Sequence, residues 1–132
     1  MRFPLAVNFR KTFPEVIGTN LICHIFPTKQ IDVQRIIDYA LNNAGLEKIV
    51  IFGSAVTWNC NADSDLDIAV WSDHNNFKLF SKYLSKNLQT VFDLIDYNSI
   101  DNVHIKNDIL KNGVVIYDGT DKTQRRKSEN ML

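Results

Sequence analysis

The stretch IVIFGSAVTWNCNADSDLDIAVW, residues 49–71, contains the features that decide the fold. It opens with an uninterrupted apolar run that ends at Gly53, and such a run is typical of a strand buried on both faces. From Asp65 to Ile68 it alternates between acidic and apolar residues and then stays apolar to Trp71, which predicts a second strand that directs Leu66, Ile68 and Val70 to the core. The stretch therefore predicts a strand, a glycine turn and a second strand that starts with carboxylates.

Helices and strands are predicted to alternate on both sides of this stretch. Apolar residues recur at three-to-four-residue spacing over residues 31–44, about 75–88 and, more briefly, 101–111, which predicts three helices. Short apolar runs over residues 90–97 and 114–117 predict two further strands. This order indicates an α/β or α+β domain with one β-sheet.

Length and composition exclude several classes of protein. The 132 residues fit one domain, and 45% hydrophobic with 23% charged residues is ordinary for a globular protein. Fifteen basic residues balance fifteen acidic ones, so a polycation that binds nucleic acid nonspecifically is not expected. Two cysteines without metal spacing predict neither a disulfide scaffold nor a zinc site. Without a membrane-length apolar run or a signal peptide, we expect a cytoplasmic location.

The two ends of the chain differ from its centre. Residues 1–30 contain all three prolines and show no clear period, so we expect an N-terminal arm that is irregular or contains one short strand. Residues 31–120 form the predicted domain, and the polar residues 121–132 predict a flexible basic tail. The net charge of zero hides a division, because residues 31–71 carry two basic and six acidic residues between basic ends.

Gly53-Ser54 is the first candidate functional feature. Glycine lets a phosphate approach the backbone closely, and a helix that starts at this turn would offer unpaired N–H groups to an anion. The Ser54 hydroxyl could add one more donor. Taken alone, the pair more often marks an ordinary strand-to-helix turn with the serine as N-cap. Neither a P-loop nor a nucleophile elbow is present.

Asp65 and Asp67 form the second feature. Residues two apart in a strand point to the same face, so the two carboxylates are expected side by side. Like charges repel, and a cation between them would favour their ionised forms. Because Mg²⁺ binds carboxylate oxygens together with substrate phosphates, the pair predicts a metal site. A solvated turn explains Asp65 more simply, whereas Asp67 lies within an apolar strand.

The next strand, VFDLIDY, supplies a third carboxylate. Asp93 and Asp96 are three apart and point to opposite faces, so at most one can join the first two acids. Sequence spacing alone does not choose between them, and each also fits an exposed position on an edge strand. A glycine turn, a carboxylate pair and a third acid together describe a site for metal-dependent nucleotidyl transfer.

This spacing resembles that of a known family. Gly53-Ser54, ten intervening residues and then Asp65-Leu66-Asp67 are similar to the GS-x10-DxD signature of the polymerase-beta-like minimal nucleotidyltransferases. The resemblance covers about residues 31–118 and implies a mixed β-sheet flanked by helices. It also implies two sets of site residues. The catalytic, metal-binding residues would be Asp65, Asp67 and Asp93, and the nucleotide-binding residues would be Gly53, Ser54 and Ser64.

Within that family, stand-alone domains of this size resemble the MntA-type antitoxins of HEPN/MNT toxin–antitoxin pairs. The resemblance implies Mg²⁺ as cofactor, ATP as substrate and AMPylation of a tyrosine on a HEPN-domain RNase toxin, the protein partner. No membrane or direct nucleic-acid partner is expected. Two alternatives stay open: an antitoxin that acts by binding alone, and a nucleotidyltransferase that modifies an antibiotic. The latter enzymes usually carry an additional helical domain.

The chain departs from the family pattern just after the Gly-Ser pair. Many relatives carry arginines at the positions of Ala55 and Thr57 and a glycine at that of Trp58. No lysine or arginine follows until Lys78. Phosphate charge must then be met by metal, by backbone N–H groups or by a basic residue elsewhere, such as Lys78 or Lys82.

Overall fold

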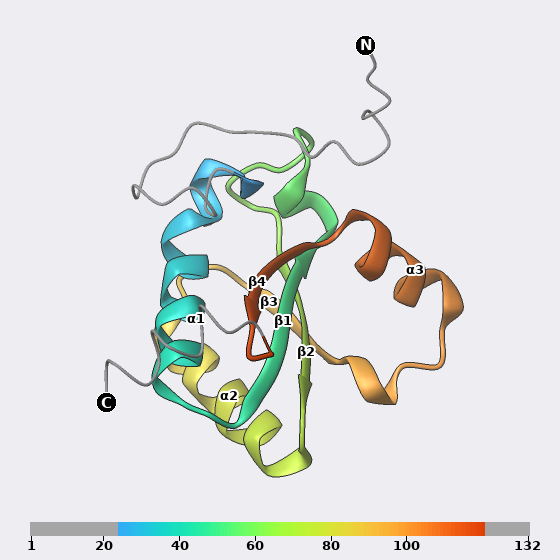
Figure 1. The fold of residues 1–132 in the computed structure, drawn as a ribbon. Helices are drawn as coiled ribbons and strands as arrows, with labels where there is room; N and C mark the ends of the chain where they lie inside the picture. The colour runs from blue at the N-terminus through green and yellow to red at the C-terminus, as the bar shows by residue number, and fades with distance from the viewer. Residues whose placement is uncertain (1–23, 121–132) are drawn as a thin grey trace.

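A computed structural model describes residues 24–120, which Figure 1 shows as a ribbon. The elements, with η marking a short 3-10 helix, are η3 Pro27–Lys29, α1 Gln30–Asn42, β1 Leu46–Phe52, η4 Gly53–Val56, β2 Leu66–Ser72, α2 His74–Asn87, β3 Phe92–Asp96, η5 Tyr97–Ser99, α3 Val103–Asn112 and β4 Val114–Asp118. The predicted alternation of helices and strands is confirmed, and each predicted element lies within a few residues of its expected position.

Four strands form one mixed sheet in the order β3-β2-β1-β4. The central strand β1 runs antiparallel to both β2 and β4, whereas β2 and β3 are parallel and are connected through α2. The mixed sheet is therefore confirmed. Its topology brings the end of β1, the start of β2 and the start of β3 to the same end of the sheet.

Different helices cover the two faces of the sheet, as Figure 1 shows. α1 and α2 lie on one face, where the larger core includes Ile51, Ile68 and Phe80. α3 lies on the other face, where a smaller core includes Val50 and Ile109. β1 contributes to both cores, and this confirms the prediction that its apolar run is buried on both faces.

The structure leaves some predictions at the chain ends open. Most of the arm predicted over residues 1–30, and all of the tail predicted over residues 121–132, lie outside the described residues. Within residues 24–120, no helix combines the length and the hydropathy needed to cross a membrane.

Candidate active site

Three segments that are distant in sequence meet at one end of the sheet. In the antiparallel ladder of β1 and β2, Phe52 lies opposite Asp67. In the parallel ladder of β2 and β3, Asp67 lies opposite Asp93. The Gly53-Ser54 turn follows directly after β1, so turn, carboxylate and second carboxylate lie side by side across three strands. This end of the sheet is the candidate site.

Gly53 lies against the Asp67 carboxylate. Its φ of 74° lies in the left-handed region that favours glycine, and a Cβ at this position would collide with an Asp67 oxygen. The short helix η4 starts here, as predicted, and no side chain caps it. The ordinary N-cap role considered for Ser54 is therefore not realised, and its carbonyl accepts hydrogen bonds from the Thr57 N–H and hydroxyl at 2.9 Å each.

The strand register decides which acid of β3 accompanies the first pair. Residues opposite each other in a ladder point to the same face, so Asp93 lies beside Asp67, on the face that α3 covers. Asp96 instead starts η5, where its carboxylate accepts hydrogen bonds from the Asn98 N–H at 3.2 Å and the Ser99 hydroxyl at 3.0 Å. Asp93 is the acid next to the site, and Asp96 is a helix cap.

Burial and neighbouring acids perturb the Asp67 carboxyl. Its pKa is raised to about 6, first by burial and then by the negative charges of Asp93, Asp65 and Asp108. Asp65 itself is exposed at the start of β2, and Asp93 is exposed at the edge of the sheet. A cation bound here would offset the repulsion between these carboxylates, so the negative potential of the cluster favours cation binding.

Asp108 is a site neighbour that the sequence reading did not identify. It lies in α3, one residue before Ile109, which is buried against β1 and β2 in the smaller core. Its carboxylate accepts a hydrogen bond from the Asn112 amide at 2.8 Å. An acid inside a predicted amphipathic helix was visible in the sequence. Its position near Asp67 became apparent only with the face of the sheet that α3 covers.

Two other predicted contributors have different surroundings. The Ser64 hydroxyl accepts a hydrogen bond from the Asn61 N–H at 3.1 Å, so it closes the turn that precedes Asp65. Lys78 and Lys82 lie exposed on α2, which packs on the face of the sheet opposite Asp67. The suggestion that either lysine compensates phosphate charge at this site is therefore wrong.

The carboxylate oxygens of the site suit a hard cation that is also coordinated by a bound substrate. Within residues 24–120, no group of three or more His, Cys, Asp or Glu side chains is arranged to hold a metal ion on its own. Mg²⁺ seldom uses such a protein cage, and it is usually bound through one or two carboxylates together with substrate phosphates and water. The paired carboxylates beside a glycine turn match that mode of binding.

The raised pKa of Asp67 predicts how stability depends on pH. The folded state holds this proton up to about pH 6, whereas the ordinary value is 3.8. The resulting contribution to stability is fully present below pH 3.8 and is lost as the pH rises through 6. Asp67→Asn should therefore be more stable than the unmodified protein at pH 7. We expect a gain of about 1–2 kcal/mol, since the carboxyl is only half-buried.

Urea unfolding between pH 3.5 and 7.5 in metal-free buffer measures this difference. Asp101→Asn, at an exposed position between η5 and α3, is the control for the loss of one carboxylate. A stability difference between Asp67→Asn and the unmodified protein that stays constant from pH 4 to 7 would contradict the assignment.

Comparisons with known proteins agree with this geometry. A family model described as "Polymerase beta, Nucleotidyltransferase" matches residues 34–122. A Methanocaldococcus jannaschii protein named "Putative protein adenylyltransferase" is 37% identical over a 70-residue alignment that covers 48% of this chain and 70% of that protein.

Solved structures show the same fold. A chain of the toxin–antitoxin MntA-HepT is 23% identical with a TM-score of 0.50, and covers 77% of this chain and 85% of its own length. A chain of a toxin–antitoxin solved with AMP-PNP is 21% identical with a TM-score of 0.52, and covers 76% and 84%. With its signature residues assembled at one end of the sheet, the chain belongs to the polymerase beta nucleotidyltransferase family.

Proposed function

We propose that this protein transfers AMP from ATP, with Mg²⁺ as cofactor and pyrophosphate as leaving group, to a tyrosine hydroxyl of a partner HEPN-type RNase toxin and thereby acts as its antitoxin. The observation that carries the proposal is the row formed by Gly53, Asp67 and Asp93 at one end of the sheet. Membership of the nucleotidyltransferase family supports the reaction class. The adenylyltransferase name of the archaeal relative supports AMP transfer to a protein.

Each predicted site residue has a place in this proposal. Asp65 and Asp67 would hold the metal, which supplies positive charge to the transferring phosphoryl group. Asp93 would complete the carboxylate set and accept the proton of the attacking hydroxyl. Gly53 leaves room for the phosphates because it has no side chain, and Ser54 can donate its hydroxyl to them. Ser64 contributes indirectly by closing the turn before Asp65.

Because the two arginines are missing, other groups would have to neutralise the phosphate charge. Alanine and threonine are uncharged, so neither Ala55 nor Thr57 offers a cation. Ala55 is buried, and the Thr57 hydroxyl donates a hydrogen bond to the Ser54 carbonyl. The metal and the backbone N–H groups of the turn would then carry most of the phosphate charge. Trp58 is 56% exposed beside this turn, with its ring edge-on to Phe26 at 6.1 Å between centroids.

The toxin as acceptor is the finer part of the proposal. It is supported by two relatives of this fold that occur in toxin–antitoxin structures, one of them named MntA-HepT and the other solved with AMP-PNP. The missing arginines favour a second candidate function, an antitoxin of low catalytic activity that neutralises the toxin by binding it.

Asp93→Asn and Asp96→Asn form a matched pair that tests the assignment of the third acid. Both substitutions remove one carboxylate from the same strand, but only Asp93 faces Asp67. We expect Asp93→Asn to lower the rate of AMP transfer at least about a hundredfold. Asp96→Asn should stay within about threefold of the unmodified rate, and stability should change little because an asparagine side chain can still cap η5.

Transfer of label from ATP to the partner toxin, with Mg²⁺ present, measures both rates. Equal losses in the two variants would show that the strand register does not select the catalytic acid. Absence of any label on the toxin with the unmodified protein would refute adenylyl transfer to this partner.

A second experiment separates catalysis from binding as the mode of neutralisation. The double variant Asp65→Ala/Asp67→Ala removes both proposed metal ligands, so it should fail to relieve growth inhibition when it is expressed with the toxin. It should still co-purify with the toxin, because neither carboxylate is needed for the fold. Full neutralisation by the double variant would instead favour the binding-only antitoxin.

A further inference from the structure

Two buried charges at the start of α1 lie outside the candidate site. The Lys29 side chain is 1% exposed and the Asp32 side chain 3% exposed, and they are three residues apart in sequence. Burial of a charge is unfavourable unless the charge is well hydrogen-bonded. Each of these two charges is hydrogen-bonded to a different loop, so the contacts of each show what it holds in place.

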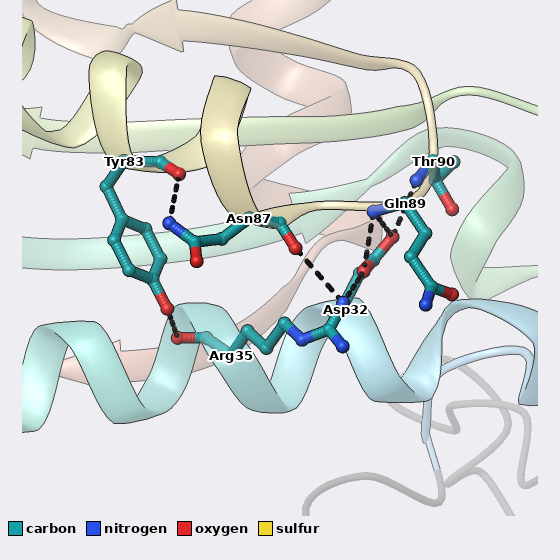
Figure 2. A network of polar contacts seen from close by, with 6 residues as sticks. All are labelled: Asp32, Arg35, Tyr83, Asn87, Gln89 and Thr90. Atoms are coloured by element: carbon teal, nitrogen blue, oxygen red, sulfur yellow. Dashed lines mark hydrogen bonds and ion pairs between the residues drawn. The ribbon is translucent and has the colours of Figure 1, made fainter.

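Asp32 is bound to the loop that leads into β3. Its carboxylate accepts hydrogen bonds from the Gln89 N–H at 3.0 and 3.1 Å and from the Thr90 N–H at 2.8 Å. Figure 2 shows these bonds together with Arg35, which pairs with Asp32 at 3.1 Å and donates to the Asn87 carbonyl at 3.0 Å. The loop that precedes Asp93 is therefore fastened to α1 at consecutive residues.

The same loop is connected to the start of β2. The residue after Thr90 is Val91, whose carbonyl accepts a hydrogen bond from the Leu66 N–H at 2.9 Å. Leu66 lies between Asp65 and Asp67 in sequence. A displacement of this loop would therefore disturb both the start of β3, near Asp93, and the start of β2, between Asp65 and Asp67.

Lys29 is bound to the other loop of the site. Its ammonium donates a hydrogen bond to the Ala62 carbonyl at 3.3 Å, in the turn that precedes Asp65. The segment just before Lys29 also contacts the glycine turn, because the Phe26 N–H donates to the Ala55 carbonyl at 2.8 Å. The start of α1 thus holds one loop through a cation and the other through an anion.

We propose that Lys29 and Asp32 are positioning residues that form a brace, fixing the two loops from which the carboxylates of the site extend. The catalytic role of this brace depends on the proposed function. Asp32 sets the position of Asp93, and Lys29 sets that of Asp65. Both side chains are buried, so neither is available to contact a nucleotide or an acceptor.

Asp32→Asn and Lys29→Met test the brace, because both keep the size of the side chain and remove its charge. Asp38→Asn on the exposed face of α1 and Lys86→Met at the exposed end of α2 are the matched controls. We expect Asp32→Asn to lower kcat for AMP transfer at least about tenfold with KM for ATP within about threefold, because Asp93 shifts while nucleotide contacts remain. Lys29→Met should instead raise KM for ATP at least about fivefold.

A second readout does not require activity. The ¹³C carboxyl signals of the ligand-free protein should shift for Asp93 in Asp32→Asn and for Asp65 in Lys29→Met, and for neither in the controls. If the unmodified protein transfers no AMP, the proposed function fails, whereas these shifts still decide the brace. Carboxyl signals that stay unchanged, or activities that fall only in proportion to the unfolded fraction measured with urea, would overturn it.

Arg35→Gln keeps the test of Asp32 decisive if Asp32→Asn fails to fold. Arg35 is 37% exposed, and its replacement removes the ion pair to Asp32 while the bonds to Gln89 and Thr90 remain. We expect faster hydrogen exchange at these two amides and a two- to fivefold lower kcat. Unchanged exchange together with unchanged kcat would overturn the part of the brace assigned to Asp32.

Discussion

Asp67 lies between two hydrogen-bonded ladders, opposite Phe52 on one side and Asp93 on the other. This register determines which groups face each other at the end of the sheet. A shift of one residue in either ladder would turn Asp67 or Asp93 to the opposite face. Because Leu66 and Ile68 are fully buried, a shift would also expose two core side chains, so the apolar pattern of β2 protects the site.

The same strand register places the Asp67 carboxylate close to other negative charges, which repel it. Asp67 is half-buried near three other carboxylates, and its pKa is raised to about 6, first by burial and then by their negative charges. Gly53 adds to the close packing, because only a residue without a side chain fits beside the Asp67 carboxylate. A divalent cation with a triphosphate would relieve the repulsion and fill the space at the glycine. Binding of these ligands would therefore make the arrangement more favourable.

The local pattern of the sequence predicted much of the fold and part of the site. Alternation placed Asp67 in a strand, and the apolar run before Gly53 predicted a strand buried on both faces. Asp93 and Asp96 were indistinguishable because their choice depends on pairing between strands. Asp108 could not be recognised because its role depends on which face α3 covers.

The residues that were predicted wrongly or not predicted have one physical cause in common, which is contact between segments distant in sequence. Lys78 and Lys82 looked suitable because they are the first cations after the signature, but α2 packs on the far face of the sheet. Asp32 was not identified from the sequence, because its burial depends on the loop at Gln89 and Thr90. Long-range contacts of this kind leave no periodic trace in the sequence.

The central claim is that Asp67 belongs to a carboxylate cluster that binds Mg²⁺ together with a nucleotide. The most direct measurement is an NMR titration of the Asp67 ¹³C carboxyl signal, first in metal-free protein and then with saturating Mg²⁺ and AMP-PNP. The account predicts a pKa near 6 without metal and a pKa well below that value with both ligands, since a bound cation favours the ionised form. An unchanged pKa with Mg²⁺ and AMP-PNP at saturation would contradict it.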